Sequence, residues 1–279
     1  MFSVSSVVVA ACLGLAPALT DLPMVALIID DIGDNYATGR DAIELPHDFA
    51  YAMLPFSPHT KNLAHLANSL GKDVIAHLPM EADQDNHFLG SGALMIDMPR
   101  EEFDNTLLES ITAVPHAIGV NNHMGSRLTR ESAQMRWLMQ AIHERGGLFF
   151  VDSRTTTRSV ALRWARRSDV AATFRDIFLD NVKSRIYIEK QLKNLVAKAK
   201  RDGHALGIAH PHRLTIDVLR TWQPAETGVR LVKISEYVET HRYAANMLST
   251  PLQASIVAAT ERTDNSDNAD PTKYPNAQR

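Results

Sequence analysis

The 279-residue chain carries a net formal charge of -3 and a single cysteine, Cys12. This length supports one substantial hydrophobic core, and a composition of 45% hydrophobic and 22% charged residues is that of an ordinary soluble globule. The balanced charge excludes a basic footprint for nucleic acid, and one cysteine excludes both an intrachain disulfide framework and a cysteine-rich zinc finger.

Residues 1–20 are expected to lie outside the fold, as a signal peptide or an N-terminal anchor. They contain no charged residue, and the apolar stretch at 7–16 is too short to cross a bilayer comfortably. Small residues around Pro17 favour cleavage after Ala18, although residues 9–12 also loosely match a lipoprotein box. We therefore expect an exported protein of the periplasm or cell envelope, with an uncleaved N-terminus as its one possible membrane contact.

The first predicted strand, residues 25–29, runs directly into two carboxylates, Asp30 and Asp31. A continuous apolar run that ends in turn residues is typical of a strand buried on both faces, as in a parallel sheet. Neighbouring side chains of a strand point to opposite faces, so both carboxylates can serve one site only where the strand ends and the chain turns. Gly33 would permit that turn.

Strands and helices are then expected to alternate along the chain. The further expected strands are 48–54, 73–76, 117–120, 148–151, 169–173, 205–209 and 229–234. Helices are expected from 57 to 70, from 99 to 111, from 129 to 145, through 158–167, from 184 to 201 and through 216–219, and residues 82–93 are expected to form a loop.

This alternation predicts an α/β domain over residues 21–245. We expect a distorted or incomplete (β/α) barrel of about seven parallel strands, with a doubly wound open sheet as the alternative. Residues 246–279 are rich in Asn, Asp, Thr and Pro, and they are expected to form a disordered tail.

Acidic and imidazole side chains recur at the carboxyl ends of the predicted strands. They are Asp30, Asp31, His77, His123, Asp152, His210 and His212. In either architecture these strand ends converge on one face of the sheet, so one functional site explains them better than separate accidents.

The residue types in this set suit metal-assisted hydrolysis of an amide or an ester. Two imidazoles and one carboxylate form a common open zinc shell, a second carboxylate can act as a base, and a protonated histidine can act as an acid. Competing catalytic signatures are missing from the sequence: it has no GxSxG elbow, no Walker A loop, no HExxH and no GxGxxG after a strand.

Five ordered strings carry a family resemblance: IIDDIG, HLPME, GVNNHMGSR, FFVDSRTT and ALGIAHPH. Together they resemble the divergent polysaccharide deacetylase family over residues 25–238. The resemblance implies a distorted (β/α) barrel and metal-dependent removal of acetyl groups from sugars. It implies Asp30 as base, Asp31 as metal ligand, and His210 or His212 as general acid.

The remaining site residues follow from the same resemblance and from their place after the strands. His77 stands where the main deacetylases have a paired-histidine motif, so His123 is expected to supply the second nitrogen to a divalent metal, expected to be zinc. The supporting or substrate-binding candidates are Glu81, Asn122, Arg127, Asp152 and Arg154. Of these, Asp152 is the expected acidic partner that raises the pKa of the catalytic histidine.

Three functions remain open from the sequence. The first is a secreted zinc hydrolase that deacetylates a cell-envelope carbohydrate. The second is an envelope protein that binds metal or sugar without catalysis, and the third is a metal hydrolase with a non-sugar substrate. Metal analysis separates the two enzymes from a metal-free binding module, and substrate screening separates the enzymes from each other.

Overall fold

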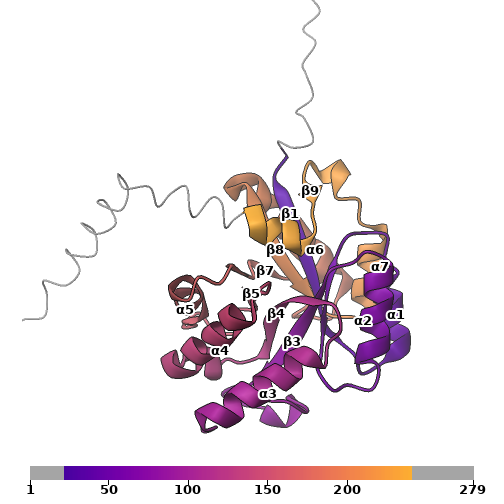
Figure 1. Ribbon diagram of the computed structural model, residues 1–279. Helices are drawn as coiled ribbons and strands as arrows, with labels where there is room; N and C mark the ends of the chain where they lie inside the picture. Colours follow the sequence, from indigo (N-terminus) through magenta and orange to yellow (C-terminus); the bar gives the residue numbers. More distant parts are fainter. Residues whose placement is uncertain (1–21, 241–279) are drawn as a thin grey trace, which may run out of the picture.

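The computed structural model describes residues 22–240, which form one parallel sheet surrounded by helices (Figure 1). The strands are β1 (Met24–Ile32), β2 (Ala50–Met53), β3 (Val74–Met80), β4 (Ala117–Met124), β5 (Phe149–Asp152), β6 (Ala172–Phe174), β7 (Ile177–Phe178), β8 (His204–Ala209) and β9 (Arg230–Leu231). The expected N-terminal signal or anchor and the expected C-terminal tail lie outside the described residues.

The sheet curls into an incomplete barrel. Its strand order is β6-β5-β4-β3-β2-β1-β8-β7, with β9 added beside β1, and every pairing is parallel. β6 and β7 stand at opposite ends of this order although only Arg175 and Asp176 separate them in the chain. The Arg175 backbone N–H donates to Asp152 on β5 and that of Asp176 to Leu206 on β8, each at 2.9 Å. The two residues therefore connect the two edges of the sheet, and the predicted incomplete barrel is confirmed.

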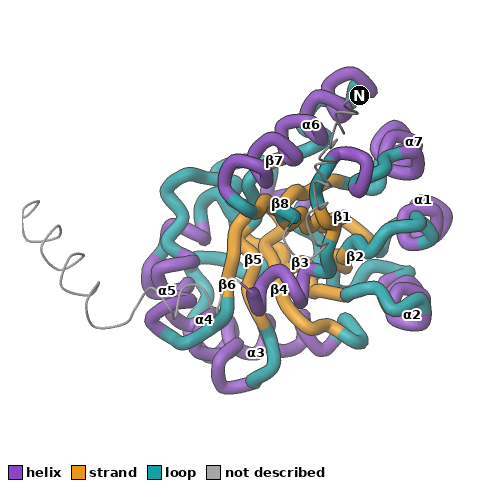
Figure 2. Tube along the Cα trace, turned by 90° about the horizontal axis from the view of Figure 1, so that it is seen from above, coloured by secondary structure: helices purple, strands orange, loops and turns teal. Residues whose placement is uncertain are grey.

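The helices lie around the outside of the strands, as the view along the barrel shows (Figure 2). They are α1 (Tyr36–Ile43), α2 (Thr60–Ser69), α3 (Arg100–Thr112), α4 (Ser132–Arg145), α5 (Ala161–Arg167), α6 (Arg185–Asp202) and α7 (Arg213–Thr221), with short 3-10 turns at Asn86–Phe88, Leu128–Arg130 and Ala225–Thr227. A further helix, at residues 234–240, ends the described part of the chain. None of the helices within residues 22–240 is both long and apolar enough to span a membrane.

Two elements differ most from expectation. The eight-residue helix α1 was not expected; it is capped by Asn35, whose side chain accepts a hydrogen bond from the Thr38 backbone N–H. The last expected strand, 229–234, shrinks to the two-residue β9, because residues 234–240 turn into a helix.

The apolar side chains of β1 divide between two cores. Val25, Leu27 and Ile29 belong to the cluster that the helices cover, whereas Ala26 and Ile28 belong to the cluster inside the barrel. This alternation follows from the two-residue period of a strand. It places the next inward position, residue 30, at the carboxyl end of the barrel interior.

The helix at residues 234–240 closes the opposite end of the barrel. Ile234, Tyr237 and Val238 are buried with the interior cluster, and the Ser235 backbone N–H donates to the Asp73 carboxylate at 2.9 Å. Asp73 precedes β3, so this helix covers the amino ends of the strands. The carboxyl ends are left for the polar side chains.

Candidate metal centre

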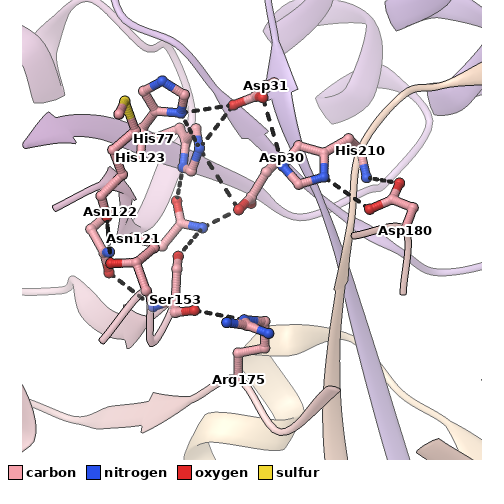
Figure 3. A network of polar contacts seen from close by, with 12 residues as sticks. Asp30, Asp31, His77, Asn121, Asn122, His123, Ser153, Arg175, Asp180 and His210 are labelled. Atoms are coloured by element: carbon pink, nitrogen blue, oxygen red, sulfur yellow. Dashed lines mark hydrogen bonds and ion pairs between the residues drawn. The ribbon is translucent and has the colours of Figure 1, made fainter. Parts of the chain in front are cut away.

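The two adjacent carboxylates reach one site through a bulge in β1. The register of β1 against β2 shifts between Ile29 and Ile32, and Asp31 has a φ of 57°, in the left-handed region. The strand thus continues past the point where the sequence predicted its end. The bulge turns Asp31 so that its side chain lies beside that of Asp30 (Figure 3).

Three side chains, from β1, β3 and β4, converge on one point. Asp31 Oδ1 lies 3.1 Å from His77 Nε2 and 2.9 Å from His123 Nδ1, and the two nitrogens are 3.2 Å apart. Ligand atoms about 2.0–2.1 Å from a tetrahedral zinc ion lie roughly 3.3 Å from one another. The predicted set of Asp31, His77 and His123 therefore comes together at a spacing that suits one divalent ion.

The Asp31 carboxylate has the character of a metal ligand. Its Oδ1 atom is buried and has no well-aligned hydrogen bond, although two imidazole nitrogens lie within 3.1 Å. Burial alone would raise the pKa of Asp31, but the imidazoles of His123 and His77 hold that pKa well below its usual range. A mixed nitrogen and oxygen donor set fits zinc among the common divalent ions.

Asp30 lies deeper than Asp31, inside the mouth of the barrel. Its side chain is 3% exposed, its Oδ1 accepts a hydrogen bond from Asn121 Nδ2 at 2.8 Å, and its Oδ2 lies 3.7 Å from His77 Nε2. Burial raises the pKa of Asp30, against the opposing charges of His77 and His210. A carboxylate beside the metal point but outside the ligand set has the position of a base.

His210 follows β8 and faces the site from the other side of Asp31. Its Nε2 lies 3.6 Å from Asp31 Oδ2, and its Nδ1 lies 3.0 Å from Asp180 Oδ1. Burial would lower the pKa of His210, but the contact with Asp180 and the charge of Asp31 raise it to about 9. The imidazole therefore carries a proton at neutral pH.

The expected acidic partner of this histidine was wrong. Asp152 ends β5, and its carboxylate accepts a hydrogen bond from the Arg154 backbone N–H at 2.8 Å. The partner is Asp180, which follows the short strand β7. β7 pairs with β8, so the end of β7 is adjacent to His210, whereas β6 and β7 lie between β5 and β8.

His212 stacks on His210 with ring centroids 5.8 Å apart. Together with Asp180 they form a second group of potential ligands, but both Asp180 oxygens are already engaged. Oδ1 faces His210 Nδ1, and Oδ2 accepts from the His210 backbone N–H and from the Thr215 hydroxyl. Burial lowers the pKa of His212, so of the two candidate acids only His210 combines a raised pKa with the facing carboxylate.

The other predicted supporting residues make contacts that connect the loops and strand ends around the site. Glu81 pairs with Arg127 at 2.8 Å and accepts a hydrogen bond from the Ile96 backbone N–H, which fixes the loop after β3. Asn122 accepts from the Ser153 backbone N–H, which ties the end of β4 to the end of β5. Arg154 covers the Phe174 ring, with its guanidinium carbon 4.3 Å from the ring centroid.

Four residues of the network were missed from the sequence: Asn121, Ser153, Arg175 and Asp180 (Figure 3). Asn121 could have been found, because residues 121 and 123 share one face of a strand. The Arg175 guanidinium donates to the backbone carbonyls of Ser153 and Arg154, at 2.6 and 2.9 Å. No periodic pattern marks either Arg175 or Asp180.

A pocket of about 510 Å³ opens beside Asp31 and His210. It extends between the start of α7 and the residues that precede α6, and it brings Lys183 and Arg213 to the same opening. The site is therefore accessible on the side where the protonated imidazole lies.

A sequence model of divergent polysaccharide deacetylases matches residues 27–238, which contain every site residue described above. The chain belongs to the divergent polysaccharide deacetylase family. Two bacterial relatives, both named uncharacterized proteins, are similar over 70% of the chain: YibQ of Escherichia coli K12 at 34% identity, and a protein of Haemophilus influenzae at 33% identity. The aligned region spans 61% of the length of YibQ and 69% of the other.

The fold of this family member is also found in a solved structure. The crystal structure of the uncharacterized protein ATU2773 from Agrobacterium tumefaciens C58 superposes with a TM-score of 0.74. The similarity covers 80% of this chain and 91% of that chain, at 22% sequence identity. At this level of identity the likeness shows a shared fold.

Proposed function

We propose that this protein is an exported, zinc-dependent hydrolase that removes acetyl groups from a carbohydrate of the cell envelope. One observation carries the proposal: the three ligand atoms of Asp31, His77 and His123 meet between a buried carboxylate, Asp30, and a protonated imidazole, His210. Base, ligands and acid are the parts that hydrolysis of an amide or an ester requires.

Each of these side chains then has one role in the reaction. A divalent ion, when bound, supplies Lewis acidity that polarises the acyl group and acidifies water. Asp30 accepts the proton of the attacking water through a carboxylate oxygen. His210 donates the proton at Nε2 to the departing amine or alcohol, while Asp180 holds Nδ1 and keeps the ring oriented.

Membership of the deacetylase family supports the carbohydrate substrate and the acetyl group. The pocket beside His210 lies on the side where the leaving group must receive its proton, so we assign the sugar to that side. The uncharged, apolar start of the sequence supports export, which N-terminal sequencing of the protein recovered from an envelope fraction would test.

Metal analysis of purified variants tests the ligand assignment. We expect about one equivalent of zinc in the parent protein and far less in His77→Ala and His123→Ala, with both variants still folded by circular dichroism. Full stoichiometric metal in both variants would overturn the assignment.

Turnover of an acetylated aminosugar oligomer tests the roles of the two carboxylates. Asp30→Asn should keep the metal and lose roughly 100- to 10,000-fold in kcat, because only the base is removed. If Asp30→Asn loses the metal and Asp31→Asn keeps it, the two roles are reversed. A fully loaded parent that hydrolyses no acetylated sugar would instead support a binding protein or a non-sugar substrate.

A further inference from the structure

The side chain of Asn121 lies at the centre of the polar network, completely buried, with both ends of its amide engaged (Figure 3). Its Oδ1 is 2.7 Å from His77 Nδ1, and its Nδ2 donates to Asp30 Oδ1 at 2.8 Å. Residue 121 pairs with residue 77 across β3 and β4, so the sheet register places the amide directly beside the imidazole. One side chain thus contacts both a metal ligand and the base.

The carbonyl end of this amide determines which nitrogen of His77 carries the proton. A carbonyl oxygen only accepts hydrogen bonds, so His77 Nδ1 must be the protonated nitrogen in the neutral ring. The lone pair is then on Nε2, which faces Asp31 Oδ1 at 3.1 Å. Fixing the tautomer of a ligand histidine in this way orients the ring and strengthens metal binding.

The amino end of the same amide supports the base. The bond from Asn121 Nδ2 holds Asp30 Oδ1 at 2.8 Å and leaves Asp30 Oδ2 facing His77 Nε2 at 3.7 Å. The bond to Asp30 also fixes the orientation of the amide, because a flip would place the amide oxygen against a carboxylate oxygen of Asp30.

We propose that Asn121 is a positioning residue that sets the tautomer of His77 and the orientation of Asp30 with one amide. The proposal rests on the proposed function for the roles of these two groups. It also explains why the partner of the ligand histidine is an amide, where carboxylates are common. A carboxylate at position 121 would hold His77 equally well, but it would face Asp30 with a like charge.

Two substitutions separate the two halves of this role. Asn121→Asp keeps an acceptor for His77 and removes the donor to Asp30, so it should bind zinc within about threefold of the parent and lose at least about 100-fold in kcat, with KM little changed. Asn121→Leu removes both contacts, so its zinc affinity should also fall by about 10- to 100-fold. Gln134→Leu, which removes a buried amide that bonds to the Ile96 carbonyl, is the matched control and should change neither value.

Zinc affinity is measured by chelator competition, and the His77 tautomer by nitrogen-15 NMR of the imidazole rings. In the zinc-loaded parent and in Asn121→Asp we expect a protonated Nδ1 in a hydrogen bond, and in Asn121→Leu we expect that signal to shift or exchange with water. The affinity and NMR measurements need no substrate, so they remain decisive even if the parent hydrolyses no acetylated sugar.

Two results would overturn the inference. Parent-like zinc affinity together with an unchanged His77 signal in a folded Asn121→Leu protein would show that the amide does not set the tautomer. Parent-like kcat in Asn121→Asp would show that the amide does not position the base. If Asn121→Leu fails to fold, Asn121→Ser, which shortens the side chain, takes its place under the same two criteria.

Discussion

At the residue scale, His210 is held between two carboxylates with different tasks. Asp180, buried and engaged on both oxygens, faces Nδ1, and Asp31 faces Nε2. Burial of the ring opposes its charge, but the contact with Asp180 and the charges of Asp31 and Asp30 together outweigh burial, so the pKa of His210 is raised to about 9. A general acid with this pKa keeps its proton through neutral pH and loses it only in alkaline solution.

Replacing Asp180 with Asn tests this account through the pH dependence of kcat. The neutral amide removes the charge that raises the pKa of His210, so that pKa should fall toward its ordinary value of about 6.5. The parent profile should be bell-shaped, and in Asp180→Asn the alkaline limb should move to lower pH, with a loss of roughly tenfold or more in kcat at pH 8.

An alkaline limb that stays in place in Asp180→Asn would contradict the assignment of His210 as the acid. Asp152→Asn is the comparison variant, since Asp152 does not contact the imidazole, and its alkaline limb should stay where the parent has it.

At the element scale, the carboxyl end of β1 depends on a tight turn at Gly33. Its φ is 146°, and an added Cβ would lie 2.8 Å from both Ser57 Cβ and Thr60 Oγ1. Ser57 precedes α2 and Thr60 is its first residue, so the start of α2 packs against this turn. The position therefore requires glycine for its conformation and also for the close approach of the next segment.

Gly33→Ala should destabilise the fold and loosen the metal site. We expect the free energy of unfolding to fall by about 2–3 kcal/mol, from backbone strain and the two close contacts, and zinc affinity to fall with it because Asp31 lies two residues away. Gly71→Ala is the matched control: its φ of 68° is also left-handed, but an added Cβ meets no atom within 4 Å. Equal losses in the two variants, by urea unfolding, would contradict the role of the close contacts.

Sequence patterns predicted elements well where one pattern ran unbroken. The apolar run of β1 and the helical stripes of α4 and α6 were found. β3 and β4 were predicted too short, because His77 and Asn121 interrupt the apolar pattern inside strands whose ends line a polar site. β7 has only two residues and gave no pattern, which is why Asp180 after it was missed and Asp152 was chosen as the partner of the histidine.

At the scale of the whole molecule, the barrel has a polar end and an apolar end. The helix at 234–240 inserts Tyr237 into the interior cluster at the amino ends of the strands, where the side chain is 1% exposed. The proposed metal ligands Asp31, His77 and His123 lie toward the carboxyl ends of β1, β3 and β4. The apolar side chains around Tyr237 and the candidate metal site therefore lie at opposite ends of the barrel.

Tyr237→Ala should separate the stability of the barrel from zinc binding and activity. Removing a buried aromatic ring should lower the free energy of unfolding by about 3–5 kcal/mol, measured by urea titration. At a temperature where the variant is still folded, zinc content and kcat should equal those of the parent. Leu70→Ala, at a half-exposed position, should change stability by less than about 1 kcal/mol. Loss of zinc from a folded Tyr237→Ala protein would contradict this separation.

The architecture as a whole could be predicted because alternating strands and helices leave few arrangements for a parallel sheet. Whether the sheet closes depends on the sixth and seventh strands, which have three and two residues and whose ends are joined by Arg175 and Asp176. Such short segments carry too little periodicity to fix their pairing. The convergence of the strand ends was predictable because it follows from the parallel sheet itself. The hydrogen-bond partners within the polar network, such as Arg175 and Asp180, were not predictable.

The placement of Asp30 and Asp31 in consecutive positions has a consequence for how this site can vary. One peptide unit fixes their Cα atoms about 3.8 Å apart, so the proposed proton acceptor and the proposed metal ligand keep the same backbone separation whenever β1 moves. Loops that follow the other strands can lengthen, shorten or change sequence without altering this separation. Changes in those loops can therefore alter which substrate is bound. The spacing between Asp30 and Asp31, on which the proposed activation of water depends, stays the same because the two residues are adjacent in the sequence.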